Sequence, residues 1–196
     1  HDGRFGAYTH ELITPKEEID LERFASCPFP IYEENIQLVL ALTDALGIGR
    51  ETAYAGILKT SPDIGMYTSV ETGDCSIRNA FAANDAVSFG SIINAYTQPF
   101  LLLYNLRTDQ GNRLEAFANA IRQSTAKPVC IGVIGEHKKA CARYMQRATG
   151  IQAQAVERPK EWIQAQNVRH VLCAGNIKGE GRQFLEEMIE EARQNV

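Results

Sequence analysis

Apolar positions in the first third of the chain recur at helical spacing. Residues 34–46 and 50–59 each place apolar side chains on one face of a helix, and Gly47 ends the first of the two. The segment SPDIG at 61–65 interrupts this pattern, so we place a linker over residues 61–74. The sequence therefore predicts a pair of helices that closes a first unit.

From residue 76 onward, short apolar runs alternate with helical patterns. The runs PFLLLYN at 99–105 and PVCIGVI at 128–134 are continuously apolar, as in strands buried on both faces of a sheet. Further strands are predicted at 77–83, 151–156 and 170–174, and helices at 86–96, 113–124, 136–149, 159–166 and 181–194. This alternation predicts an α/β fold with a mostly parallel sheet and helices on both faces.

Polar loops follow four of the predicted strands. The carboxyl ends of parallel strands meet at one edge of an open sheet, which is where such folds bind ligands. The loops that would gather there contain Asn84 and Asp85, the charged segment 105–113, Glu136 and His137, and the glycine-rich segment 175–181. We therefore expect the functional site at this edge.

Two of these loops also have a purely structural interpretation. Asn84 and Asp85 are residue types that cap helix N-termini. Arg107, Asp109 and Arg113 can form a solvated ion network that adds little stability. Three charges and a glycine in one strand-to-helix loop nevertheless suit anion binding better.

The loop at 175–181 is similar to an anion-binding turn, because its glycines allow close backbone approach at a helix N-terminus. The sequence nevertheless contains no G-x-x-x-x-G-K-[ST], G-x-S-x-G or H-E-x-x-H motif. An NTPase or hydrolase that works by itself is therefore not indicated. The four His and five Cys show no metal-ligand spacing, so we predict no metal site.

Composition narrows the class of protein further. Hydrophobic residues make up 44% and charged residues 22%, which is ordinary for a globular chain. The net charge of −4 argues against a nucleic-acid partner, which needs a basic surface. No apolar run reaches the roughly 18 residues that span a bilayer, and no signal-peptide pattern is present. The odd number of cysteines favours reduced, buried thiols and a cytosolic compartment.

Several segments together resemble the ligase subunit of poly-γ-glutamate synthases (the CapB/PgsB type), in the Mur-ligase-like superfamily. The resemblance covers residues 33–190. The segments that carry it, in chain order, are ENIQLVLALTDALGIGRETAYAGILKTSPDIG, NAFAANDAVS, NLRTDQGNR, VIGEH and AGNIKGEGRQFLEEM. The strand-to-helix junction in NAFAANDAVS and the charged loop in NLRTDQGNR are similar to motifs of that family.

The resemblance implies the C-terminal part of such a ligase. Residues 1–68 would be the end of the central, phosphate-binding domain, and residues 69–196 a Rossmann-like C-terminal domain. The implied reaction is ATP-dependent: a terminal carboxylate is activated as an acyl phosphate, and the amine of glutamate then attacks it. ATP and Mg²⁺ are the implied cofactors. Because their phosphate site would lie mainly on the absent portion, we expect the isolated chain to be inactive.

The resemblance also implies roles for individual residues. A catalytic role near the reacting groups falls to Asn84, Asp85, Arg107 and Asp109. Substrate binding falls to Arg107, Arg113, Asn176 and Gly179, with the arginines holding carboxylates. Nucleotide binding falls to Asn79 and Gly175.

Partners and location follow from the same resemblance. The expected ligands are ATP, glutamate and a polyglutamyl acceptor, and the expected partners are membrane-bound subunits of a polymer synthase. We expect a cytoplasmic protein, peripheral at the inner face of the cell membrane; self-association stays open. Two alternatives remain: another Mur-type ligase similar to folylpolyglutamate synthase, and a non-catalytic α/β docking module.

Overall fold

A computed structural model describes residues 19–24, 33–60, 64, 68–73, 75–83, 85–107 and 111–194. It divides into two compact units, His1–Ser61 and Pro62–Val196, which we call the helical unit and the sheet unit. The division lies a few residues before the one that we placed between 68 and 69. The short strand that begins at Thr68 belongs wholly to the sheet unit.

The helical unit contains the two predicted helices, α1 (Glu33–Ala45) and α2 (Arg50–Leu58), after a short 3₁₀ turn, η1 (Leu21–Phe24). They enclose a small core made of Phe24, Ile36, Leu40, Ala53 and Tyr54. A second, apolar face of α1 is exposed; it carries Leu38 and Leu42 and continues to Leu46, directly after the helix. A helical segment thus precedes the first strand, as predicted.

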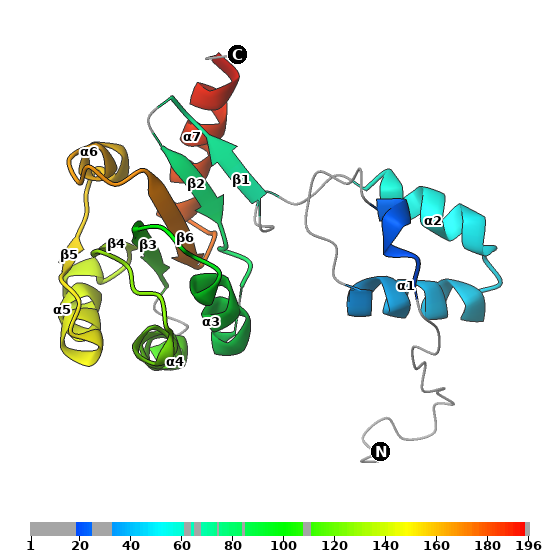
Figure 1. Ribbon diagram of the computed structural model, residues 1–196, viewed down its shortest axis with the longest axis horizontal. Coiled ribbons are helices and arrows are strands. Elements are labelled where there is room, and N and C mark those ends of the chain that lie inside the picture. The colour runs from blue at the N-terminus through cyan, green and yellow to red at the C-terminus, as the bar shows by residue number, and fades with distance from the viewer. Residues whose placement is uncertain are drawn as a thin grey trace. The chain divides into compact units, whose positions relative to one another are not determined.

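The sheet unit is built on six strands in the order β1-β2-β6-β3-β4-β5 (Figure 1). Their bounds are Thr68–Glu71 (β1), Ser76–Asn79 (β2), Phe100–Leu106 (β3), Ile131–Gly135 (β4), Ala153–Ala155 (β5) and His170–Gly175 (β6). Only β1 is antiparallel to its neighbour; all other pairs are parallel. The mostly parallel sheet of the sequence prediction is therefore confirmed.

Helices cover both faces of the sheet. On one face lie α3 (Ala86–Asn94), α4 (Gly111–Gln123) and α5 (Lys138–Thr149); on the other lie α6 (Pro159–Gln164) and α7 (Glu180–Gln194) (Figure 1). Strand β3 is buried along its whole length because it serves both cores. Leu102 and Tyr104 face α3–α5, whereas Leu101 and Leu103 face α6 and α7.

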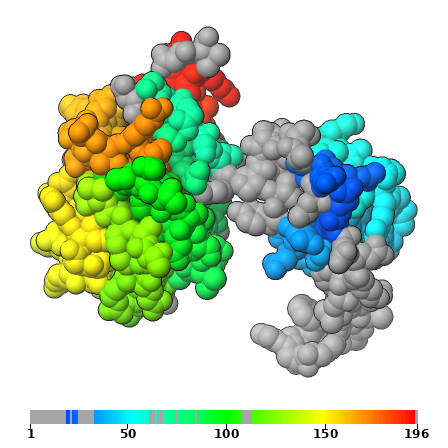
Figure 2. Space-filling model, viewed as in Figure 1, coloured from blue at the N-terminus to red at the C-terminus, as the bar shows by residue number. Residues whose placement is uncertain are grey.

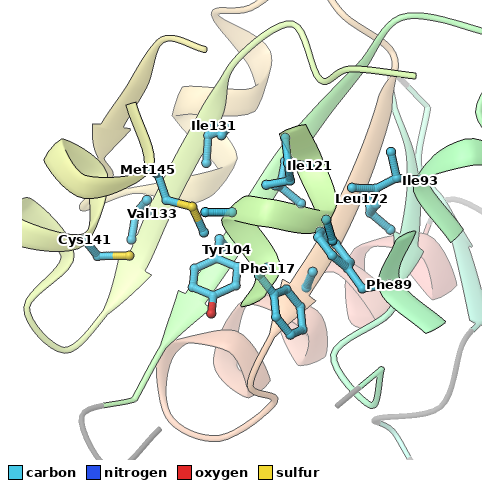
Figure 3. Close-up of a cluster of buried hydrophobic side chains, with 14 of the residues drawn as sticks. Phe89, Ile93, Tyr104, Phe117, Ile121, Ile131, Val133, Cys141, Met145 and Leu172 are labelled. Carbon is cyan, nitrogen blue, oxygen red and sulfur yellow. The ribbon is translucent and has the colours of Figure 1, made fainter. Parts of the chain in front are cut away.

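Aromatic side chains fill the core beneath α3 and α4 (Figure 3). The rings of Phe89 and Phe117 are stacked with centroids 4.4 Å apart, and Tyr104 meets Phe117 edge-on at 5.6 Å. Figure 3 shows Cys141 and Met145 of α5 beside this group, with Ile131 and Val133 of β4. Offset and edge-on ring contacts stabilise such a core beyond the area they bury.

Two local predictions were wrong. The segment 61–74 contains strand β1, not only a linker; with four residues and only Val70 buried, β1 has too few positions to show an alternating pattern. The strand predicted at 77–83 ends at Asn79. There the Asn79 side chain accepts a hydrogen bond from the Phe81 N–H, which turns the chain while Ala80 and Phe81 stay buried.

The strand order determines where the loops meet. Strand β6 lies between β2 and β3, so the chain must cross over the sheet to enter it, and β2, β6, β3 and β4 all run parallel. Their carboxyl ends therefore share one edge. After β3 the chain adds β4 and β5 on one side, and it then returns to add β6 on the other side of β3. Open α/β sheets form ligand crevices where the order of strands reverses in this way.

Phe117 provides a test of this packing. Phe117→Ala would leave a cavity against Phe89 and Tyr104, so we expect the free energy of unfolding to fall by about 3–5 kcal/mol in urea denaturation. Val87→Ala is the control, because Val87 is 80% exposed and should change stability by less than about 0.5 kcal/mol. Equal effects of the two changes would contradict the packing described.

Candidate functional site

The loops after β3, β4 and β6 surround a hollow of about 360 Å³, which we call the edge hollow. It lies at the sheet edge where the sequence predicts the site, and its volume is within the range of small-molecule sites. Its lining residues are Asn105, Leu106, Arg107, Gly135, Glu136, Lys178, Gly179 and Glu180. Cationic and anionic groups therefore meet around a backbone-rich opening.

Asn105 lies at the base of the edge hollow and is 1% exposed. Its Nδ2 donates to the carbonyl oxygens of Asn176 at 2.5 Å and Lys178 at 2.7 Å. Both partners are acceptors, which fixes which end of the amide is nitrogen. The amide thus joins the end of β3 to the loop that leads into α7.

The other end of this amide has no partner. Asn105 Oδ1 is buried and accepts no hydrogen bond within the described structure. Few buried polar atoms in native proteins lack a partner, and each costs free energy. The orphaned oxygen is therefore a point where a donor from a ligand, a water or a shifted backbone would be stabilising.

Glycines allow three backbone segments to approach Asn105. A Cβ at Gly135 would collide with Asn105 Oδ1, and one at Gly175 with the Asn105 carbonyl. At Gly181 a Cβ would lie 2.6 Å from Asn105 Nδ2. Gly135 and Gly175 also have backbone φ angles of 88° and 100°, which residues other than glycine rarely adopt. Asn105 is thus among the nearest obstacles to a side chain at all three positions, together with the carbonyls of Leu106 and Asn176.

Lys138 fixes the rim of the edge hollow. Its Nζ lies 2.8 Å from Glu157 Oε2 and 3.2 Å from Glu180 Oε2, and its side chain is only 16% exposed. The hydrogen bond that Lys138 donates to Glu157, supported by the one to Glu180, raises the pKa of Lys138. The same ammonium lowers the pKa of Glu157. Lys138 thereby links the first turns of α5 and α7 to Glu157, two residues after the end of β5.

The structure brings together only some of the predicted site residues. Arg107 and Gly179 line the edge hollow, and Gly175 and Asn176 lie directly beside it through their bonds to Asn105. Arg113 does not line it; its charge acts on Tyr104 beneath α4. Asn84 and Asp109 lie outside the described residues. The binding and catalytic roles of all these residues stay predictions.

Asn79 ends β2 with its side chain wholly buried. Nδ2 donates to the Ile64 carbonyl at 2.6 Å, and Oδ1 accepts from the Phe81 N–H at 3.2 Å. Direct contact with a nucleotide would require these bonds to open. The geometry gives Asn79 a role in positioning the chain that precedes β1.

Asp85 is the N-cap of α3. Its Oδ1 accepts hydrogen bonds from the N–H groups of Val87 at 2.9 Å and Ser88 at 2.8 Å. The bonds from Ser88 and then Val87 lower the pKa of the Asp85 carboxyl, so the charge persists well into mildly acidic solution. The capping interpretation is thus observed, whereas the catalytic one stays a prediction.

Sequence reasoning gave no role to Asn105 or Lys138. Asn105 left one signal, since it is the polar residue that ends an otherwise apolar run, PFLLLYN. Lys138 left none, because a Lys-Lys pair at a helix start is typical of solvated surface. Its two glutamate partners are distant in the sequence and become visible only in the fold.

The described part of the chain contains no group of three or more His, Cys, Asp or Glu side chains able to hold a metal ion. None of its helices is both long and apolar enough to cross a membrane.

The family model of the poly-gamma-glutamate synthase CapB C-terminal domain matches residues 67–191. This chain belongs to that family. PGA synthase CapB of Bacillus subtilis (strain 168) is 31% identical over 125 residues, which are 58% of this chain and 31% of the relative. Capsule biosynthesis protein CapB of Bacillus anthracis is 31% identical over 124 residues, which are 58% of this chain and 26% of the relative. The CapB resemblance of the sequence is confirmed, and the match spans about a third or less of each relative.

Solved structures support the CapB fold more broadly. Folylpolyglutamate synthase of Thermotoga maritima matches at a TM-score of 0.56 and 18% identity, over 82% of this chain and 40% of that one. MurF ligase of Thermotoga maritima, in complex with ADP, matches at a TM-score of 0.51 and 14% identity, over 83% of this chain and 38% of that one. One crystal structure of MurF of Acinetobacter baumannii matches at a TM-score of 0.55 and 11% identity, over 83% of this chain and 37% of that one. These likenesses show the fold, that of Mur-ligase C-terminal domains.

Replacing Asn105 tests the organisation of the CapB-family edge hollow. Asn105→Ala would leave the carbonyls of Asn176 and Lys178 without their donor, so we expect stability to fall by about 2–4 kcal/mol. Amide hydrogen exchange should also accelerate over 175–182 more than elsewhere. Asn119→Ala, at a half-buried asparagine of α4, is the control. A variant as stable as the control, with unchanged exchange over 175–182, would refute this role.

Proposed function

We propose that this chain is the C-terminal part of an ATP-dependent amide ligase that joins glutamate to a poly-γ-glutamyl chain. Membership of the CapB family supports the class of reaction. The observation that carries the proposal for this chain is the edge hollow, where Arg107 and Lys178 bring positive charge to the carboxyl ends of β3 and β6. The substrates of such a ligase are carboxylates, which guanidinium and ammonium groups bind.

The chemistry proposed is the formation of one amide bond. The terminal carboxylate of the acceptor would take the γ-phosphoryl group of ATP, so that an acyl phosphate forms and ADP leaves. The amine nitrogen of glutamate then bonds to the acyl carbon, a proton leaves that nitrogen, and inorganic phosphate departs. On this chain, Arg107 and Arg113 would hold substrate carboxylates, with Asn176 and Gly179 lining the substrate side.

The remaining predicted roles complete the proposal. Asn84, Asp85 and Asp109 would lie near the reacting groups. The turn at Gly175 would lie near the nucleotide. Asn79 would support nucleotide binding indirectly, through its hydrogen bonds with Ile64 and Phe81.

The residues present do not fit a magnesium–nucleotide site. Such a site needs backbone N–H groups around the phosphates, a lysine and a held metal ion. The sequence has no G-x-x-x-x-G-K-[ST] motif, and the described residues offer no metal-ligand cluster. We therefore assign the phosphate and Mg²⁺ site mainly to another portion of the ligase. By itself, this chain should neither hydrolyse ATP nor form glutamyl amides.

The helical unit would be the end of that ATP-binding domain. The likeness to folylpolyglutamate synthase covers 82% of this chain, more than the sheet unit alone occupies. The exposed apolar face of α1, with Leu38, Leu42 and Leu46, is a surface that further protein would bury. We further propose a cytoplasmic location at the inner face of the membrane, beside membrane-bound subunits, because the proposed product is a capsule-type polymer.

Arg107 is the residue on which to test the proposal. In the ligase assembled from this chain and its ATP-binding portion, Arg107→Ala should lower kcat/KM for glutamate by about 10- to 150-fold, or about 1.5–3 kcal/mol. Arg107→Lys should recover only part of this loss, because an ammonium cannot form a bidentate pair. Arg122→Ala, on the exposed end of α4, is the control. Unchanged kinetics in a folded Arg107→Ala enzyme would overturn the assignment.

A further inference from the structure

Helix α5 concentrates positive charge on a chain whose net charge is −4. Its sequence, KKACARYMQRAT, contains no acidic residue. Three of its cations, Lys139, Arg143 and Arg147, are exposed and follow one another at intervals of four residues. We call these three residues the α5 basic ridge.

The packing of α5 directs this ridge outward. Cys141, Ala142 and Met145 form the opposite, buried face of the helix and lie against the core under α3–α5. Residues four apart in a helix rise by about 6 Å and turn by only about 40°, so the three cations form one slanted row about 12 Å long. The surface of α5, yellow-green to yellow in Figure 2, lies at the outer side of the sheet unit.

The ridge is not used by the fold itself. Among the ion pairs between described residues, none involves the side chains of Lys139, Arg143 or Arg147. Lys138, by contrast, is occupied with Glu157 and Glu180, and Lys139 adds only a small long-range effect on Glu157. Three neighbouring like charges repel one another, so an anionic partner would relieve a cost that the fold leaves in place.

The ridge begins beside the edge hollow. Gly135 and Glu136 line that hollow, and helix α5 begins two residues later at Lys138, which is paired with Glu180 on the rim. From there the row of cations runs away from the carboxyl edge of the sheet. A chain whose end lies in the hollow can therefore continue along the ridge.

We propose that the α5 basic ridge holds the acceptor polymer, a polyanion of γ-linked glutamates, behind the end that reacts. The inference rests on the proposed function and extends it to the part of the substrate remote from the reaction. A γ-linked chain keeps one free carboxylate per residue. With five backbone bonds per residue in place of three, its extended repeat is about 6 Å, which matches the rise between successive cations of the ridge.

Because the cations of the ridge are exposed, the affinity for the polymer should depend on polymer length and on salt. Each exposed carboxylate–cation contact contributes little and is screened by salt. Several contacts on one tethered polymer act together, so affinity should rise with polymer length and fall with ionic strength. The ridge would thus retain a growing chain while letting it slide by one residue after each addition.

Fluorescence anisotropy of a labelled γ-linked glutamate decamer, titrated with the 196-residue chain at low salt, tests the proposal. The ridge variant combines Lys139→Gln, Arg143→Gln and Arg147→Gln. The matched control combines Arg50→Gln, Arg122→Gln and Arg193→Gln, which remove the same charge from α2, α4 and α7. We expect the ridge variant to weaken binding at least tenfold and the control less than threefold. A γ-linked trimer should bind more weakly than the decamer.

Three results would overturn the proposal. The first is failure of the unaltered chain to bind the decamer. The second is an equal loss of affinity for the decamer in the ridge variant and the control. The third is ridge-dependent binding only to vesicles of phosphatidylcholine with 30% phosphatidylglycerol. The last result would make the ridge a membrane contact instead. Because the assay needs no ATP and no turnover, its failure would leave the ligase proposal standing. Loss of ligase activity in Arg107→Ala would likewise say nothing about the ridge.

Discussion

The buried amide of Asn105 connects the scaffold of this domain to its candidate site. Strand β3 is the most enclosed strand of the sheet, and its last polar side chain donates to two carbonyls of the loop between β6 and α7. One backbone bond supports this connection, because the Asn176 N–H donates to the Asn105 carbonyl at 3.0 Å. The amide therefore makes the position of α7 depend on the end of β3, and glycine is required where neighbouring segments press against it.

Charge is arranged around this centre in two different ways. Lys138, with its glutamate partners on two other elements, is shielded enough for its ion pairs to act as fixed connections at the rim of the edge hollow. The cations farther along α5 have no such partners among the described residues and stay in solvent. One helix thus supplies a structural cation at its start and an interaction surface along its length.

Much of the fold could be predicted from the sequence because burial in a two-faced sheet leaves a strong pattern. Strand β3 and helix α7 were visible as a continuous apolar run and as a helical stripe. Strand β1 was not, because an edge strand with one buried residue carries too little pattern. At the candidate site, loop convergence predicted that Arg107 and Gly179 lie at one edge of the sheet, and both line the edge hollow. It could not show that Arg113 does not line the edge hollow, nor that Asn105 holds the loops together, since both depend on contacts across the fold.

The central claim is that ligands bind at the carboxyl edge of the sheet, around Asn105. A ¹⁵N-resolved NMR titration of the chain with a γ-linked glutamate trimer measures this directly, because each backbone amide reports its own surroundings. The predicted result is that shifts concentrate at residues 105–107, 135–136 and 176–180. The competing location is the hollow of about 370 Å³ at the opposite edge, lined in part by Thr72, Lys160 and Met188. Shifts confined to that second hollow, with the first set unchanged, would contradict the claim.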